Sequence, residues 1–93
     1  MKIIWTPAAA QDRADIWDYL HTVNPKAALD MDNRFSEAIS RISQFPEIGP
    51  IGITAGTREL IPHQSYRLVY QLERDAIWVL ALVHTSRQWP LES

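Results

Sequence analysis

The chain of 93 residues contains no cysteine and only three glycines. Without thiols it can form neither a disulfide framework nor a thiolate metal site, and the absence fits a reducing compartment. We therefore expect a cytoplasmic protein. No apolar run approaches the roughly 20 residues that a membrane-spanning helix needs. The N-terminal stretch has one lysine and too short an apolar segment for a signal peptide, so no membrane association is expected.

A basic excess is also missing, because nine lysines and arginines face eleven acidic residues and the formal net charge is −2. Free-standing nucleic-acid-binding proteins usually gain most of their affinity by neutralising phosphates with basic residues. The composition disfavours such a protein, although folding can still gather arginines locally. Seven of the nine basic residues are arginine, whose planar fork binds carboxylate or phosphate through two hydrogen bonds.

What is present is the composition of an ordinary globular protein, with 46% hydrophobic and 22% charged residues. This apolar content is enough to offset the chain entropy of folding, so disorder is not expected to dominate. The length suits a single hydrophobic core. We therefore expect one domain over residues 1–93.

Two capping signals organise the N-terminal half, which opens with a predicted short strand at Lys2–Trp5. Thr6-Pro7 and Asn24-Pro25 each place a capping residue before a proline, which suits the first position of a helix. The first helix is predicted to end near His21, with residues 22–23 as a connector, and the second to end at Phe45-Pro46. Two helices joined in this way form an antiparallel hairpin.

In each predicted helix, the spacing of the apolar residues indicates one buried and one exposed side. In the first helix, residues recurring every three or four positions form an apolar stripe that includes Tyr19, while Asp12 lies on the other side. The stripe of the second helix extends to Phe45. We expect these stripes to face the core.

The C-terminal half is predicted to form strands. Residues 58–61 form a strand closed by Pro62, and Tyr66–Leu72 alternates with its tyrosines and leucines on one face. After a turn at residues 73–75, the apolar run 76–83 predicts a central strand covered on both faces for most of its length, with Trp78 in the core. The prediction is an α+β fold in which the helical hairpin packs on one face of an antiparallel β-meander. The place of the first strand in the sheet cannot be read from the sequence.

An ordered set of short motifs resembles the RelE/ParE superfamily of bacterial type II toxins over essentially the whole length. The matching pieces are Trp5-Thr6-Pro7-Ala8-Ala9, Ile16 with Tyr19, Asn24-Pro25-Lys26-Ala27-Ala28, Phe45-Pro46 with Gly49, Gly56-Thr57-Arg58-Glu59-Leu60, Tyr66-Arg67-Leu68-Val69-Tyr70, and Val83-His84-Thr85-Ser86-Arg87-Gln88-Trp89-Pro90. No single piece is diagnostic, but the set with these gaps is fairly specific.

The resemblance implies a toxin that a cognate antitoxin neutralises. We expect a partly disordered antitoxin segment to wrap the toxin, docking between the helical hairpin and the sheet, with strand addition at an exposed edge as one option. The resemblance leaves the target open. RelE-like members cut messenger RNA in the ribosomal A site, whereas ParE-like members poison DNA gyrase. A third alternative is a weakly toxic module that serves antitoxin binding in autoregulation.

The RelE-like alternative would give four residues catalytic roles. Arg67 matches a phosphate-binding arginine of RelE-like toxins, and Arg87 lies where they place a second one. His84 or Glu59 would transfer protons. Each also has a plain structural interpretation: Arg67 could pair with Glu59 across the sheet, His84 could be a half-buried residue at a strand end, and Arg87 a surface charge.

The ParE-like alternative is the one that the residues favour. His84-Thr85-Ser86-Arg87 matches a His-x-x-Arg ending of ParE-like toxins, and the lysines and C-terminal tyrosine of RelE are missing. Under this hypothesis a contact surface, with no catalysis, binds gyrase through Arg58, Arg67, Arg87 and Trp89. Trp89 could equally pack the tail. No cofactor is expected, and the three scattered histidines lack the spacing of metal ligands.

Overall fold

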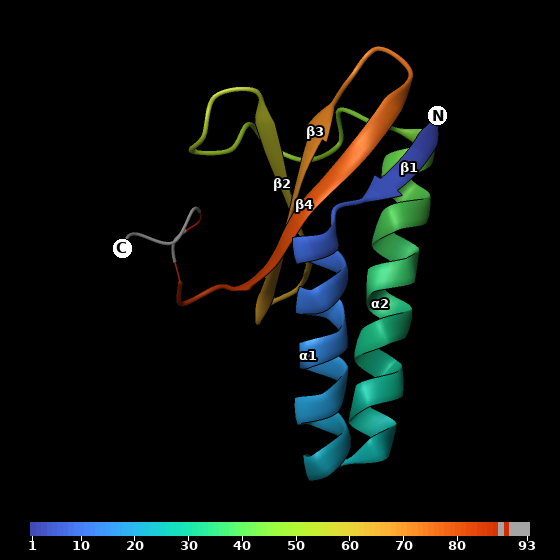
Figure 1. Cartoon of the computed structure of the whole chain (residues 1–93), viewed down its shortest axis with the longest axis vertical. Helices are drawn as coiled ribbons and strands as arrows, with labels where there is room; N and C mark the ends of the chain where they lie inside the picture. The colour runs from blue at the N-terminus through green and yellow to red at the C-terminus, as the bar shows by residue number, and fades with distance from the viewer. Residues whose placement is uncertain (88, 90–93) are drawn as a thin grey trace.

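The computed structural model describes residues 1–87 and residue 89, and its elements follow the predicted order. They are β1 (Lys2–Trp5), α1 (Pro7–Val23), α2 (Pro25–Gln44), β2 (Thr57–His63), β3 (Tyr66–Leu72) and β4 (Ala76–His84) (Figure 1). The α+β prediction is confirmed. Pro90, which the sequence places in the exit from the last strand, lies outside the described residues.

The four strands form one sheet in the order β1-β4-β3-β2. β4 pairs antiparallel with β3, and β3 with β2, as a meander requires. β1 joins the other side of β4 in parallel, with Lys2 opposite Ala76 and Trp5 opposite Val79. The sheet is therefore mixed, and β4 is a central strand as predicted, although it runs one residue further, to His84.

The helices begin where the capping signals indicate. The Thr6 hydroxyl accepts a hydrogen bond from the Ala9 N–H, and the Asn24 side chain accepts one from the Lys26 N–H. The predicted connector at residues 22–23 is wrong, because α1 continues through Val23. Asn24 alone separates the two helices and caps both of them. Its N–H donates to the Leu20 carbonyl and so closes α1. None of the helices in the described part is long and apolar enough to cross a membrane.

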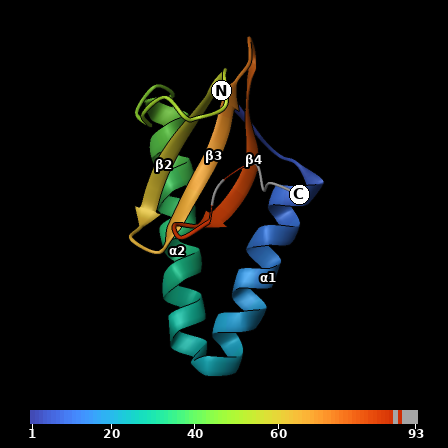
Figure 2. The same cartoon turned by 90° about the vertical axis from the view of Figure 1, so that its left-hand side faces the viewer.

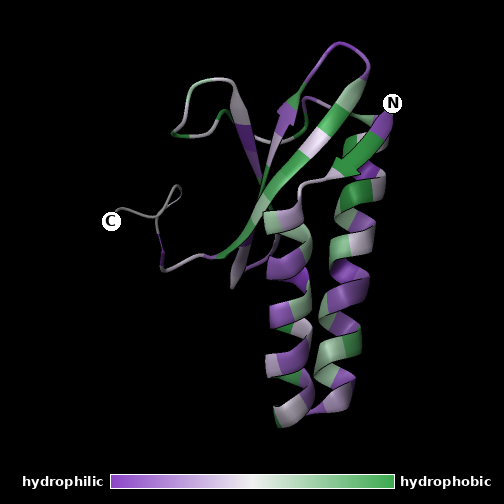
Figure 3. Cartoon of the chain, in the orientation of Figure 1, coloured by the Kyte–Doolittle hydropathy of each residue, from purple (hydrophilic) through white to green (hydrophobic). Residues whose placement is uncertain are grey.

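Both helices cover one face of the sheet and enclose the core (Figure 2). The largest fully buried side chains come from α2, β3 and β4. Figure 3 shows the hydrophobic colour running along most of β4. The buried members of this cluster are Ala9, Phe35, Ala38, Ile42, Leu60, Tyr66, Leu68, Tyr70, Ile77, Val79 and Leu82. We call the opposite, helix-free side of the sheet the outer face.

Three residues predicted to lie in the core are instead exposed. Tyr19 is 66% exposed, because the closed end of the helical hairpin extends beyond the sheet (Figure 2). Phe45 is 63% exposed, because α2 ends at Gln44 and helical spacing no longer directs the next side chain. Trp78 is 36% exposed, because it pairs with Gln71 on the outer face, where no helix covers it.

Strand β2 is longer than predicted and includes Pro62. Proline lacks the N–H that a central strand needs, but β2 lies at the edge of the sheet, where that loss is tolerated. The register between β2 and β3 shifts between Leu60 and His63, which accommodates the proline.

Candidate functional site

Arg67 lies on the outer face of the sheet and is nearly buried there. Its neighbours Tyr66 and Leu68 face the core, so alternation along β3 directs Arg67 to the other side. Its Nη1 donates to Glu59 Oε1 on β2 over 3.0 Å, and the two side chains are only 15% and 12% exposed. The expected pairing with Glu59 is thus present. The structure brings these two predicted site residues together as a shielded ion pair.

The rest of the Arg67 guanidinium faces the C-terminal tail. Its Nη2 donates to the backbone carbonyl of Arg87. Its Nε is buried and has no hydrogen-bond partner among the described residues. The Arg67 guanidinium therefore already holds a carboxylate and a carbonyl, one through each terminal nitrogen.

The tail itself returns over the outer face after β4 ends. Trp89 is half-buried and packs against a small apolar cluster of Val69, Ala81 and Val83. The Arg87 N–H donates to the His84 carbonyl in a turn, while the Arg87 side chain is exposed. Arg67, Arg87 and Trp89 are thus brought together. Gln88 and Pro90, which also belong to the predicted C-terminal motif, lie outside the described residues.

His84 lies on the other side of the sheet from Arg67 and Glu59. It pairs in register with Tyr66, and the two rings meet edge to face at 5.6 Å between centroids. Its Nδ1 accepts from the Ser86 N–H at 3.1 Å and contacts the Ser86 hydroxyl at 2.7 Å. The imidazole is exposed, so the half-buried position expected as its structural alternative is wrong. The structure does not bring His84 to the Glu59–Arg67 pair.

Arg58 also lies apart from Arg67. It is opposite Tyr70, and its Nη1 donates to the carbonyls of Gly49 at 2.8 Å and Glu47 at 3.2 Å. These contacts hold the loop that follows α2. They commit Arg58 to shaping this loop, rather than joining the tail.

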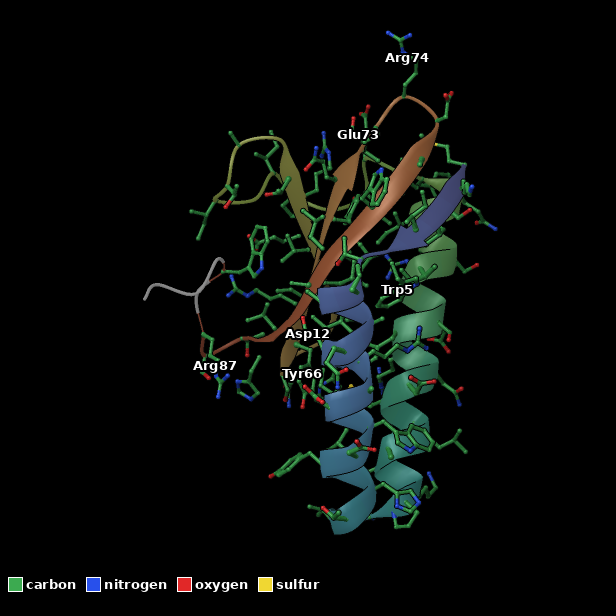
Figure 4. All side chains as sticks on the ribbon, in the orientation of Figure 1. Trp5, Asp12, Tyr66, Glu73, Arg74 and Arg87 are labelled. Atoms are coloured by element: carbon green, nitrogen blue, oxygen red, sulfur yellow. The ribbon has the colours of Figure 1, made fainter. Side chains whose placement is uncertain are left out.

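A groove of about 420 Å³ runs between the first turns of α1 and the end of β4. It exists because β1 ends at Trp5, opposite Val79, so the rest of β4 has no strand beside it on that side. Ala8, Asp12, Asp15 and Ile16 line one wall. The other wall comes from residues 80–84, with Tyr66, Arg87 and Trp89 at its end. Figure 4 shows Asp12, Tyr66 and Arg87 near this end of β4.

Asp12 is a groove residue that sequence reasoning placed wrongly, on the solvent side of α1. Its Oδ2 accepts the Leu82 N–H at 3.1 Å and so satisfies a donor of the open β4 edge. Burial raises the pKa of the Asp12 carboxyl above its usual value near 3.8, the Leu82 hydrogen bond opposes this, and the Asp15 charge adds to it. The sequence shows an acidic residue near the start of this helix. It does not show the partner, because the Leu82 N–H is a backbone group that almost every residue type has.

The described residues contain no group of three or more histidine and acidic side chains placed to hold a metal ion. The polar groups that the described residues present lie on two surfaces. On the outer face they are an ion pair under an aromatic tail, and in the groove they are an open strand edge beside an acidic helix.

Comparison with known proteins gives consistent matches over nearly the whole chain. The family model for the ParE toxin of the type II toxin-antitoxin system parDE matches residues 3–89. The chain is 30% identical over 90 residues to the protein "Putative toxin Y4kP" of Sinorhizobium fredii, covering 96% of this chain and 93% of that one. It is 29% identical over 86 residues to "Toxin RelE2" of Caulobacter vibrioides, covering 92% and 97%.

Solved structures share the fold. A chain of the chromosomal ParDE toxin-antitoxin system from P. aeruginosa superposes with a TM-score of 0.80 at 22% identity, covering 90% of this chain and 95% of that one. A YoeB/ParE toxin from Agrobacterium tumefaciens gives 0.65 at 16% identity, covering 90% and 98%. The family match over residues 3–89, joined to this fold, leads to one conclusion: the chain belongs to the ParE toxin family of type II toxin-antitoxin systems.

Proposed function

We propose that this toxin inhibits growth by binding DNA gyrase, without catalysing a reaction itself, and that a cognate antitoxin neutralises it. The observation that carries the proposal is the state of Arg67. Its guanidinium is held by Glu59 and by the Arg87 carbonyl, and His84 lies on the opposite face of the sheet. Phosphate binding by Arg67 with His84 as the proton carrier would need these two groups at one point, which this arrangement does not provide, and Glu59 is already paired with Arg67.

The proposed contact surface is the tail, supported from below by Arg67. The Arg87 side chain is exposed, and Trp89 is half-buried on its apolar cluster. Arginine and tryptophan are the residues that most often dominate binding energy at protein interfaces. We do not include Arg58 in the proposed surface, because its guanidinium binds carbonyl groups of the loop after α2.

The toxicity test uses brief induction in cells followed by two readouts. We expect filamentation with an SOS response and cleaved DNA. Arg87→Ala should weaken gyrase binding roughly tenfold or more, as loss of a central interface arginine does. Arg74→Ala is the matched control, because Arg74 is exposed at the turn before β4, at the other end of that strand (Figure 4). It should keep full toxicity.

Other outcomes would contradict the gyrase proposal. A rapid stop of translation, with transcripts cut at codon positions, would favour the alternative of a ribosome-dependent endoribonuclease. The similarity to "Toxin RelE2" is the observation that supports this alternative. That mechanism would use Arg67 and Arg87 on the phosphate and His84 or Glu59 as proton carriers. No growth effect, with antitoxin binding intact, would point instead to a module that serves autoregulation.

For the antitoxin, we propose the groove beside β4 as the docking site of an extended segment. Asp12 holds the Leu82 N–H and the Thr6 hydroxyl contacts the Leu80 carbonyl, and the rest of the strand edge up to His84 offers backbone groups for strand addition. Ile16 with Leu80 supplies apolar surface. Ala8→Trp should fill part of this groove and weaken antitoxin binding roughly tenfold or more. Ala10→Trp makes the same change on an exposed part of α1 that lines a different hollow, and should bind normally. If both variants bound the antitoxin equally well, the docking site would have to lie outside this groove.

A further inference from the structure

We infer that Arg67 is the positioning residue of the C-terminal tail: it fixes the backbone at Arg87 and thereby sets how Arg87 and Trp89 are presented on the outer face. The inference deepens the proposed function and rests on it for its link to toxicity. It does not need Arg67 to touch any target. It assigns to this arginine a task within the toxin, between the sheet and the tail.

The first step is the orientation of the guanidinium by Glu59. Glu59 Oε1 accepts from Arg67 Nη1 at 3.0 Å, and its Oε2 lies 3.4 Å from the Ile53 N–H. With both groups at least 85% shielded from solvent, the carboxylate fixes the plane of the fork. Nη2 is then directed at the tail.

The second step is the bond from Nη2 to the Arg87 carbonyl. A charged donor on a main-chain carbonyl is stronger than a neutral hydrogen bond, and here the donor is anchored in a strand. The acceptor is a backbone atom, so it constrains the chain itself rather than a rotatable side chain. Trp89 adds a second attachment two residues on, through Val69, Ala81 and Val83.

The third step is the residue type. Lysine carries a single ammonium on a flexible stem and cannot span the carboxylate and the carbonyl with a planar fork. Neither Glu59 nor the tail carbonyl would then be held in the same geometry. Arginine at position 67 is therefore specified by two acceptors on either side of it, one on β2 and one on the tail.

Limited trypsin digestion of the purified toxin tests this directly, because trypsin cleaves the peptide bond whose carbonyl belongs to Arg87. Cleavage after Arg74, in the exposed turn at the other end of β4, serves as an internal reference for cleavage at a site away from the tail. Mass spectrometry follows release of the peptide 88–93. In Arg67→Gln, we expect cleavage after Arg87 to accelerate about tenfold to a hundredfold relative to the Arg74 site.

The double variant Glu59→Gln/Arg67→Gln keeps the test valid if the single variant unfolds, because it leaves no unpaired buried charge. It should show the same selective acceleration. An unchanged ratio of the two cleavage rates in a folded variant would overturn the inference, whatever the target of the toxin. A selective acceleration with full toxicity would uphold the inference and would instead contradict the tail as the gyrase-binding surface.

Discussion

Tyr70 shows how one side chain can belong to the core and to a loop at once. Its ring is fully buried, while its hydroxyl donates to the Pro46 carbonyl at 2.7 Å and accepts from the Gly49 N–H at 3.0 Å. A side chain at position 49 would meet the Tyr70 ring, since a Cβ there would lie 2.9 Å from Cε1. The loop after α2 is therefore shaped around this hydroxyl, with Arg58 completing the contact.

Asp12 gives a prediction on pH at the same scale. Because its pKa is raised in the folded protein, protonation favours the folded state. The contribution is fully present below the unfolded value near 3.8 and is lost as the pH rises through the folded value. Relative to Asp12→Asn, which keeps an oxygen acceptor for the Leu82 N–H, the wild type should therefore lose stability from about pH 4 toward neutrality.

Urea denaturation at several pH values measures this difference. Asp12→Ala removes the acceptor altogether and should cost about 1–2 kcal/mol at pH 7. Asp18→Ala, an exposed position on the same helix, should change the free energy of unfolding by no more than about 0.5 kcal/mol. A difference between wild type and Asp12→Asn that stays flat with pH would contradict the assigned role of burial.

At the scale of elements, Arg13 joins three of them. From α1 its Nε donates to Asp32 Oδ1 on α2 at 2.6 Å, and its Nη2 to the Ser36 hydroxyl at 2.9 Å. Its guanidinium also stacks over the Trp5 ring of β1, 5.1 Å from the centroid. The helical hairpin is thus fixed to itself and to the edge strand by one residue.

Arg13→Lys should lower the free energy of unfolding by about 1–2 kcal/mol, since an ammonium loses both the fork and the stacking. The matched control is Arg34→Lys, an exposed arginine on α2, which should cost no more than about 0.5 kcal/mol. Chemical denaturation followed by tryptophan fluorescence compares the two. Equal effects would mean that Arg13 contributes charge alone.

The elements also show why local patterns predicted much of the fold but not all of it. Thr6 and Asn24 mark the helix starts because capping is decided within a few residues. The parallel pairing of β1 with β4 depends on residues far apart in sequence, so no local pattern carries it. The exposure of Trp78 had the same origin, because it depends on which face of the sheet the helices cover.

The candidate site follows the same division. The Glu59–Arg67 pair could be proposed from alternation along two neighbouring strands. The contacts of Arg67 with the Arg87 carbonyl and of Asp12 with the Leu82 N–H could not, because every residue has these backbone groups. Side-chain identity cannot indicate which of them a charged group will select.

For the whole molecule, the main asymmetry is between the two faces of the sheet. The helices bury one face, whereas the buried apolar residues of the outer face form only the small cluster under Trp89 within the described part of the chain. The net charge of −2 gives the molecule no general attraction to nucleic acid. Binding by this toxin therefore depends on local surfaces.

A matched pair of substitutions measures the asymmetry. Ile77→Val removes one methylene from a fully buried position in β4 and should cost about 0.5–1.5 kcal/mol. Ile61→Val makes the same change on β2, where the side chain is 57% exposed, and should have little effect. Thermal denaturation of both variants gives the comparison. A larger loss of stability from Ile61→Val than from Ile77→Val would contradict a stabilising core on the helix-covered face of the sheet.

The pairing of the first strand with the last has a consequence for synthesis. The contact from the Thr6 hydroxyl to the Leu80 carbonyl, at 3.4 Å, spans 74 residues. Both helices leave the ribosome before β4, the strand that they cover. Their apolar faces therefore stay uncovered by β4 until that strand has been synthesised. Non-local pairing of this kind slows folding, because loop closure comes before the contacts that reward it. Translation that stops before β4 thus leaves fragments that lack the strand joining β1 to β3, and we expect proteases to remove them.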